Sequence, residues 1–361
     1  MKKLPLNRQE LRSLIEDNCI YVDKTQDVYR LTEHATQYFF SRPRRFGKSL
    51  LISTLRELFE GNKDLFKGLW IYDKWEWKPY PVVHISFSSI GYQDLGLEKA
   101  IYTKINDMAI SHGISLTKEG ISQRFLELIK KMRETEKVVI LIDEYDKPII
   151  DYIDDIETAE KNRKILKNFY STIKDNEDNI KFLFITGVSK FSRVSIFSDL
   201  NHLEDITLHE DFNSLVGITE TELKTYFADY IDKLQRKYKD YFPNIIEKIR
   251  DEYLGYSWDG QHFIYNPYSL IHLFSKQRFA AHWFISGTPT FLIKMLKNKH
   301  LTAFDLENVS ATDELLDKYQ IKNMTLIPLL FQTGYLTIKH IDLVRNIYKL
   351  GFPNKEIERA F

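Results

Sequence analysis

The sequence predicts a three-layer α/β fold, with helices on both sides of a mostly parallel sheet. An α-helical, winged-helix-like C-terminal region is expected to follow it. Three observations favour this fold class. An apolar strand at 38–40 leads through a Gly-Lys-Ser turn into a helix over 50–60, and a second buried strand at 138–142 ends in two acids. Between and after them, short apolar runs alternate with helical patterns, which is typical of strands joined by crossover helices.

The turn between the first strand and its helix has the chemistry of a phosphate-binding loop. It carries Gly47, Lys48 and Ser49, and Leu50 follows as the next residue of the helix. Backbone N–H groups at a helix N-terminus point at an anion, a lysine adds positive charge, and a serine hydroxyl can ligate Mg²⁺. The alternative is an ordinary helix start with a solvated lysine.

The entrance of this turn departs from the usual G-x-x-x-x-G-K-[ST] pattern. Position 42 holds arginine where the pattern has glycine, so we expect a differently shaped loop entrance. Arg42, Arg44 and Arg45 are either a solvated basic turn or additional phosphate contacts. With Pro43 and Phe46 they complete the predicted cofactor-binding stretch 42–50.

Composition narrows the class of protein. The 361 residues contain 51 Lys and Arg against 51 Asp and Glu, which argues against a nucleic-acid surface over the whole protein but leaves a local one open. The one cysteine, Cys19, rules out an internal disulfide. No apolar run reaches the length of a membrane span, and the N-terminus lacks the apolar core of a signal peptide. We therefore expect a cytoplasmic protein without membrane contact.

The elements around the loop follow from local patterns. Leu11, Leu14 and Ile15 mark a short amphipathic helix before the first strand. After the loop helix come an aromatic-rich link at 66–77 and a buried strand at 82–87. Helical patterns then occupy two stretches, at 95–109 and 123–134.

The second functional motif is the strand at 138–142 with the two acids that follow it, called the acidic strand below. Its run of aliphatic residues ends in Asp143 and Glu144, and ligands bind beyond the carboxyl ends of such parallel strands. There the first acid can hold Mg²⁺, with Ser49, and the second can deprotonate an attacking water. The alternative is a strand followed by a solvated acidic turn. The order favours the site, because Asp143 lies 95 residues after Lys48 (143 − 48) with one further strand between them.

A third strand at 181–187 places Thr186 near its carboxyl end. This hydroxyl can bond the γ-phosphate or the water, or it simply caps the strand. Arg193 follows closely and could act as an arginine finger, in this chain or toward a neighbouring one. A last strand is predicted at 205–208.

Together, these motifs resemble the bacterial AAA-ATPase-like family, and the resemblance extends over nearly the whole chain. It implies a P-loop NTPase core with an additional strand and a catalytic glutamate. It assigns Lys48 to phosphate, Ser49 and Asp143 to Mg²⁺, and Glu144 to the base, and it makes Arg42 a family variant of the loop. The segments that carry the resemblance are 21–25, 42–50, 142–148, 186–189 and 201–207.

After residue 216 the alternation of short apolar strands and helices gives way to helical patterns separated by turn-rich stretches. We therefore expect an ATPase core with an N-terminal helical segment over 1–216 and a lid over 217–361. Thr219 and Glu222 form a capping-box pattern, a helix start is expected at 286–292, and a helix at 326–331 precedes a strand at 335–338. Family members often continue into a PD-(D/E)xK nuclease-like domain. We predict no nuclease site in this chain, because neither of its Glu-x-Lys triplets follows an Asp-bearing strand.

The predicted function is Mg²⁺-dependent ATP binding and hydrolysis that drives a conformational switch. The absence of an Asn-Lys-x-Asp motif favours ATP over GTP. The alternative is a nucleotide-gated module with little turnover that presents its lid to a protein or nucleic acid, and a purely structural protein would bind no nucleotide. A homo-oligomer is also compatible with the sequence.

Overall fold

A five-stranded parallel sheet forms the centre of the molecule. The computed structural model describes residues 1–174, 176–190, 196–197, 200, 202–287, 303–307, 309–312 and 326–360. Neighbouring strands lie in the order β2-β3-β4-β1-β5, and all four pairings are parallel. The strands are β1 (Gln37–Ser41), β2 (Val82–Ser86), β3 (Val138–Asp143), β4 (Ile180–Gly187) and β5 (Glu204–Asp205). The predicted mostly parallel α/β core is thus confirmed.

The strand order places the two sequence motifs near each other, at the carboxyl ends of the parallel strands. The loop strand β1 and the acidic strand β3 both pair with β4, which lies between them. Their carboxyl ends therefore lie one strand apart. β1 and β3 are buried along their whole length, which explains their unbroken apolar runs.

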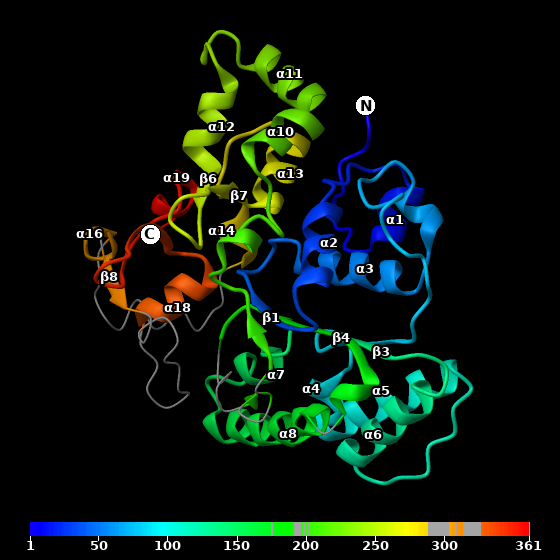
Figure 1. The fold of residues 1–361 in the computed structure, drawn as a ribbon. Coiled ribbons are helices and arrows are strands. Elements are labelled where there is room, and N and C mark those ends of the chain that lie inside the picture. Colours follow the sequence, from blue (N-terminus) through cyan, green and yellow to red (C-terminus); the bar gives the residue numbers. More distant parts are fainter. Residues whose placement is uncertain are drawn as a thin grey trace.

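Helices cover both faces of the sheet. Figure 1 shows α1, α2 and α3 on one side and α4 to α8 on the other. The first group comprises α1 (Leu11–Glu16), α2 (Thr25–His34) and α3 (Lys48–Phe59), with the 3₁₀ turn η1 (Lys63–Phe66) after it. The second comprises α4 (Tyr92–Leu95), α5 (Leu97–Ser111), α6 (Ile121–Met132), α7 (Lys147–Ile150) and α8 (Ile156–Lys174), and the 3₁₀ turns η2 (Glu177–Asn179) and η3 (Glu210–Phe212) flank β4 and β5.

The C-terminal region is a helical arrangement with two small antiparallel sheets. β6 pairs with β7, and β9 lies beside β10, which also pairs with β8. The predicted capping box is confirmed, since Thr219 accepts from the Glu222 N–H and Glu222 accepts from the Thr219 N–H. The elements are α10 (Glu220–Tyr226), α11 (Ala228–Lys237), α12 (Ile245–Tyr253), β6 (Leu254–Tyr256), β7 (Ile264–Tyr265), α13 (Pro267–Lys276), α14 (His282–Gly287), α16 (Ala303–Leu306), β8 (Val309–Thr312), α18 (Leu326–Thr333), β9 (Thr337–Asp342), β10 (Ile347–Gly351) and α19 (Lys355–Glu358).

Two hydrophobic clusters hold these parts together. The larger one contains the sheet and its helices and extends to Tyr256, Trp258 and Trp283 of the C-terminal region. The smaller one joins Ile20 to the helices between α10 and α13. Both clusters therefore cross residue 216, so burial of apolar surface ties the C-terminal region to the sheet.

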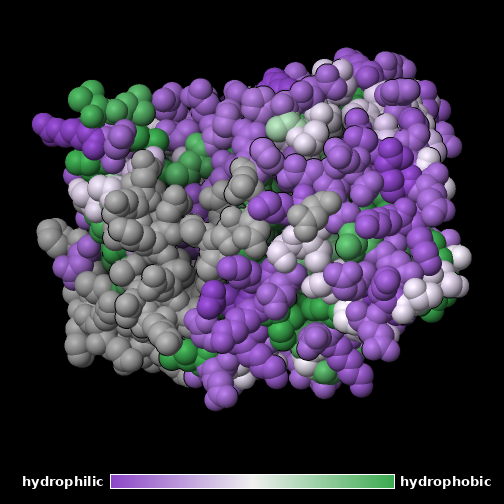
Figure 2. Space-filling view, turned by 60° about the horizontal axis from the view of Figure 1, so that its bottom comes forward, coloured by the Kyte–Doolittle hydropathy of each residue, from purple (hydrophilic) through white to green (hydrophobic). Residues whose placement is uncertain are grey.

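The described side chains on one face of the molecule are mostly polar. On the face drawn in Figure 2, hydrophilic side chains predominate and hydrophobic ones lie in small separate groups. Among the helices of the described residues, none combines the length and the apolar character needed to cross a bilayer.

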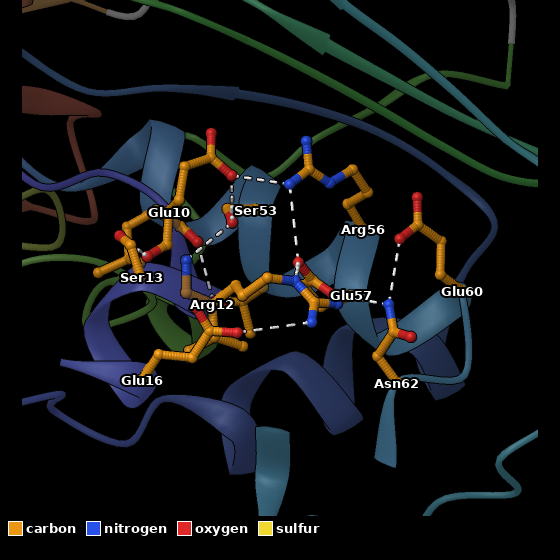
Figure 3. Close-up of polar contacts among 12 residues, drawn as sticks. Glu10, Arg12, Ser13, Glu16, Ser53, Arg56, Glu57, Glu60 and Asn62 are labelled. Carbon is orange, nitrogen blue, oxygen red and sulfur yellow. Dashed lines mark hydrogen bonds and ion pairs between the residues drawn. The ribbon is translucent and has the colours of Figure 1, made fainter. Parts of the chain in front are cut away.

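A polar network fixes the N-terminal helix to the loop helix (Figure 3). The buried Glu57 of α3 accepts bonds from Arg12 of α1, at 3.2 and 2.7 Å, and from Asn62 at 2.6 Å. On the preceding turn of α3, the Ser53 hydroxyl donates to Glu10 at 2.9 Å. The network sets where the segment before α1 lies relative to the loop.

Replacing Glu57 with glutamine is expected to lower the free energy of unfolding by about 1–3 kcal/mol. The amide –NH₂ at this buried position would face donors from Arg12 and Asn62, so a charged acceptor would be replaced by a donor without a partner. Urea titration measures the change. Glu16→Gln is the matched control, because that carboxylate pairs with the same arginine at 3.8 Å but is 61% exposed. Its effect should stay below about 1 kcal/mol, and equal effects of the two variants would contradict the assignment.

Candidate functional site

The loop helix begins with a glycine in a left-handed conformation. Gly47 has φ +97° and is the N-cap of α3, and Arg45 before it has φ +68°. Positive φ is costly for a side chain such as that of Arg45, and such strain concentrates at ligand-binding loops. The turn brings the N-terminus of the twelve-residue helix α3 to the carboxyl edge of the sheet. Unpaired N–H groups at that terminus suit an anion.

The lysine of the loop is buried within the loop itself. The Nζ atom of Lys48 donates to the carbonyl oxygens of Arg42 at 2.8 Å and Pro43 at 2.9 Å. Burial lowers the pKa of Lys48, while nearby carboxylates of β3 and of the turn after it oppose the shift. A lysine held in this way presents its charge beside the helix N-terminus.

The two predicted motifs meet in space. The Ser49 hydroxyl donates to Oδ2 of Asp143 at 2.6 Å. Burial raises the pKa of Asp143 to about 6, with the charge of Glu144 adding to the rise and the Ser49 bond opposing it. The hydroxyl and the carboxylate are thus adjacent oxygen donors at the edge where the loop ends.

Three buried oxygen atoms around this contact have no hydrogen-bond partner among the described residues. They are Oδ1 of Asp143, Oε2 of Glu144 and Oγ1 of Thr186. Buried polar atoms are normally paired. Asp143 ends β3, Glu144 follows it, and Thr186 lies near the end of the neighbouring strand β4, so these unpaired oxygens at the ends of two paired strands suggest a missing ligand. An oxygen-rich donor set of this kind fits Mg²⁺. The residues present therefore fit the metal that the sequence predicts.

Glu144 has a strained backbone. Its φ is +55°, a left-handed value that is unusual for a residue with a long side chain, and it borders the cavity described below. Strain of this kind persists where the surrounding structure fixes the residue. Here Tyr145 provides that anchor, because its N–H donates to the Thr186 carbonyl at 3.1 Å.

Asp146 joins the turn after β3 to the end of β4, a role that the sequence did not predict. Its carboxylate accepts from the N–H groups of Val188 and Ser189, at 3.1 and 2.8 Å, and from the Ser189 hydroxyl at 2.8 Å. Gly187 is required by the same close approach, since a Cβ there would lie 2.6 Å from the Tyr145 ring. The only signal in the sequence was a further acid two positions after Glu144.

A cavity of about 450 Å³ lies beside the loop, between the sheet edge and the C-terminal helices. That volume is in the range of small-molecule sites. Its polar lining includes Arg44, Arg45, Lys48, Ser49 and Glu144 of the loop and of the turn after β3. The apolar lining comes from the N-terminal segment and from residues 215–218, and α13 contributes Tyr268, Ile271 and His272.

The side chains at the loop entrance point away from this cavity, contrary to the phosphate contact considered for Arg42. The Arg42 guanidinium is 1% exposed and donates to the carbonyls of Thr207 at 2.7 Å and Phe212 at 3.3 Å. It also lies 4.0 Å from the centroid of the Trp258 ring. Burial lowers its pKa to about 9. Arg42 is thus an anchor between the loop entrance and the C-terminal region.

Other loop residues make the same connection. Phe46 borders the cavity, but its ring packs edge-on against Tyr256 and Trp258, at centroid distances of 4.8 and 5.4 Å. Trp283 of α14 donates from Nε1 to the Arg44 carbonyl at 3.0 Å. Pro43 packs near Gly334, where an added Cβ would come within 2.8 Å of its ring. Of the predicted binding stretch, residues 44–50 border the cavity and 42–43 do not.

Two further predictions fall partly or wholly outside the described residues. Arg193, the predicted arginine finger, lies outside them. The helix start expected at 286–292 meets the end of α14 at Gly287, and 288–292 also lie outside the described part of the chain.

A buried carboxylate ties α19 to the helices near the loop. Glu356 accepts from the Ser269 hydroxyl and from the Trp283 N–H, both at 2.7 Å. Burial raises its pKa to about 7, well above the ordinary 4.5. Between these two pH values the folded chain binds a proton at Glu356 that the unfolded chain has lost. The stabilising contribution of this group is therefore fully present below pH 4.5 and is lost as pH rises through 7.

Glu356→Gln is expected to remove that part of the pH dependence. Between pH 5 and 8, the wild-type free energy of unfolding should fall by about 2–3 kcal/mol more than that of the variant. Urea titrations at the two pH values measure the difference. Parallel pH profiles for the two proteins would contradict the effect of burial on this carboxylate.

Comparisons with known proteins agree with this geometry. Residues 5–197 match a protein family described as "Predicted AAA-ATPase". The chain is also 42% identical, over 368 aligned positions, to a protein of Azotobacter chroococcum mcd 1 named "Uncharacterized protein in vnfD 5'region". That alignment covers 99% of this chain and 69% of the relative.

Proposed function

Because the chain belongs to the AAA-ATPase-like family, we propose that it binds ATP with Mg²⁺ in the cavity beside the loop and hydrolyses it to drive a conformational switch. The observation that carries the proposal is the 2.6 Å contact between Ser49 and Asp143, which joins the two motifs beside the cavity that Ser49 lines. A helix start that can bind an anion, next to an acid that can bind a metal, suits a phosphate–metal ligand.

The polar lining residues at the loop would hold the triphosphate. Lys48 and the N–H groups of the α3 N-terminus would bind phosphate oxygens, and Arg44 and Arg45 would add positive charge. Ser49 and Asp143 would hold Mg²⁺, which when bound supplies charge neutralisation on the β- and γ-phosphates. The apolar lining residues, which include Ile20 and Ile218, suit an uncharged base.

Glu144 is the proposed base. A water oxygen attacks the γ-phosphorus, its proton passes to the Glu144 carboxylate, and the β–γ bridging oxygen leaves with ADP. The unpaired Oε2 atom and the strained backbone of Glu144 support this role. The free hydroxyl oxygen of Thr186 is the proposed partner of the γ-phosphate or of the attacking water.

The switch would run from the loop to the region 217–361, which we propose as a winged-helix-like lid on a core formed by 1–216. Three loop residues contact that region through Trp258, Tyr256 and Trp283. A movement of the loop when phosphate binds would therefore be transmitted directly to the lid through these contacts. The helix α18 followed by the β9–β10 hairpin supports the winged-helix comparison.

Phosphate release from ATP tests the enzymatic proposal. We expect turnover that requires Mg²⁺ and stops on chelation, with ATP preferred to GTP. Nucleotide binding without turnover would instead identify a nucleotide-gated module that presents its lid to a protein or nucleic acid. No nucleotide binding at all would reject both.

A further inference from the structure

Three side chains that can ligate a metal converge at the end of the sheet opposite the loop. His34 is the last residue of α2, three positions before β1, and Glu204 lies in β5, where it pairs with Tyr38 near the start of β1. His209 is the N-cap of η3. One ligand atom from each of the three side chains lies within 4.8 Å of the other two. The cluster is therefore separate from the nucleotide cavity.

The spacing suits one small cation. Nε2 of His34 is 3.3 Å from Oε1 of Glu204, close to the separation of two ligand atoms on a tetrahedral Zn²⁺ with bonds of about 2.1 Å. The rings of His34 and His209 are 6.0 Å apart and inclined at 68°, so they can approach one ion from two sides. Nδ1 of His209 accepts from the backbone N–H of Asp211 at 3.3 Å, and the Asp211 carboxylate lies 3.9 Å from the same nitrogen. An ion bound through Nδ1 would replace this hydrogen bond and would gain a second carboxylate nearby.

Ordinary packing explains only part of this arrangement. Phe212 contacts both imidazoles, at centroid distances of 6.3 Å from His34 and 5.2 Å from His209. Aromatic packing alone does not require a carboxylate within hydrogen-bond distance of the His34 ring. All three side chains are also accessible, with His34 53% exposed and the other two at 34%. An ion can thus reach them from solvent.

We propose that His34, Glu204 and His209 bind a divalent transition metal of the Zn²⁺ class. Two imidazoles and one carboxylate are donors that such ions prefer, whereas Mg²⁺ favours oxygen ligands alone. Three protein ligands leave one position for water or an outside ligand. The ion would join the end of α2 to the segment 204–212, which includes the Thr207 and Phe212 carbonyls that accept from Arg42.

Calorimetric titration of the tag-free, EDTA-treated full chain with Zn²⁺ and with Co²⁺ tests this site. Excess Mg²⁺ is kept present to fill oxygen-only sites. We expect one bound ion per chain, and at least about tenfold weaker binding for His34→Ala and for His209→Ala. His340→Ala is the matched control, because His340 is exposed on β9 and outside the cluster. Its affinity should equal that of the wild type.

The visible absorption of bound Co²⁺ gives a second readout, because it reports the coordination of the ion. It should be present in the wild type and in His340→Ala and absent from the two cluster variants. Circular dichroism verifies that the variants are folded. The proposal is overturned if the wild type binds neither ion, or if binding survives in both cluster variants.

Discussion

Lys48→Ala is expected to weaken ATP binding by on the order of 100-fold, about 3 kcal/mol. The variant removes the one loop side chain whose charge lies at the start of α3, where it now bonds to two loop carbonyls. Without it, the γ-phosphate would lose a charge-assisted bond in a partly dry cavity, where such bonds are strongest. Titration with ATP in the presence of Mg²⁺ measures the loss.

Two further variants separate charge from loop shape. Lys48→Met retains most of the apolar stem and deletes only the ammonium group, so it should lose affinity to the same extent. Lys67→Ala removes an exposed lysine just after η1 and should bind ATP like the wild type. An affinity for Lys48→Met within threefold of the wild-type value would contradict the phosphate-binding role.

Glu144→Gln is expected to leave ATP binding nearly intact and to slow turnover by about 10²- to 10⁴-fold. The amide is similar in shape to the carboxylate but cannot take the proton of the attacking water. Phosphate release under single-turnover conditions measures the chemical step. Glu134→Gln, at an exposed position after α6, is the matched control and should hydrolyse at the wild-type rate. Full turnover by Glu144→Gln would assign the base to another residue.

The backbone of Glu144 allows a second test of the same role. Its φ of +55° is relaxed for glycine, so Glu144→Gly should gain up to about 1 kcal/mol of stability while it loses turnover. A gain in stability together with a loss of activity is the signature of strain kept for function. A variant that loses both would show that the side chain supports the fold instead.

The sequence was most informative where burial is complete. β1 and β3 are buried on both faces, so their apolar runs were unmistakable, and the loop chemistry linked them in the correct order. The family resemblance drawn from these motifs is confirmed over residues 5–197. The predicted last strand at 205–208 was less accurate, because β5 covers only Glu204–Asp205. A two-residue edge strand leaves no periodic pattern to read.

The sequence did not predict one long helix or the contacts between segments that are distant along the chain. The helix α8 over Ile156–Lys174 had no counterpart among the predicted elements. Arg42 resembled its basic neighbours in sequence, yet it is buried against Trp258, which lies more than 200 positions further along the chain. The turn residue Asp146 gave no hint that it holds the end of β4. Each of these depends on which segments the fold brings together.

Hydrogen exchange with and without ATP and Mg²⁺ tests most directly whether one triphosphate site joins the loop, the acidic strand end and the C-terminal helices. We predict simultaneous protection of peptides that cover 42–51, 138–146 and 267–272, and no such protection in Lys48→Met. Protection confined to other segments, or protection of the loop without the acidic strand end, would contradict the account.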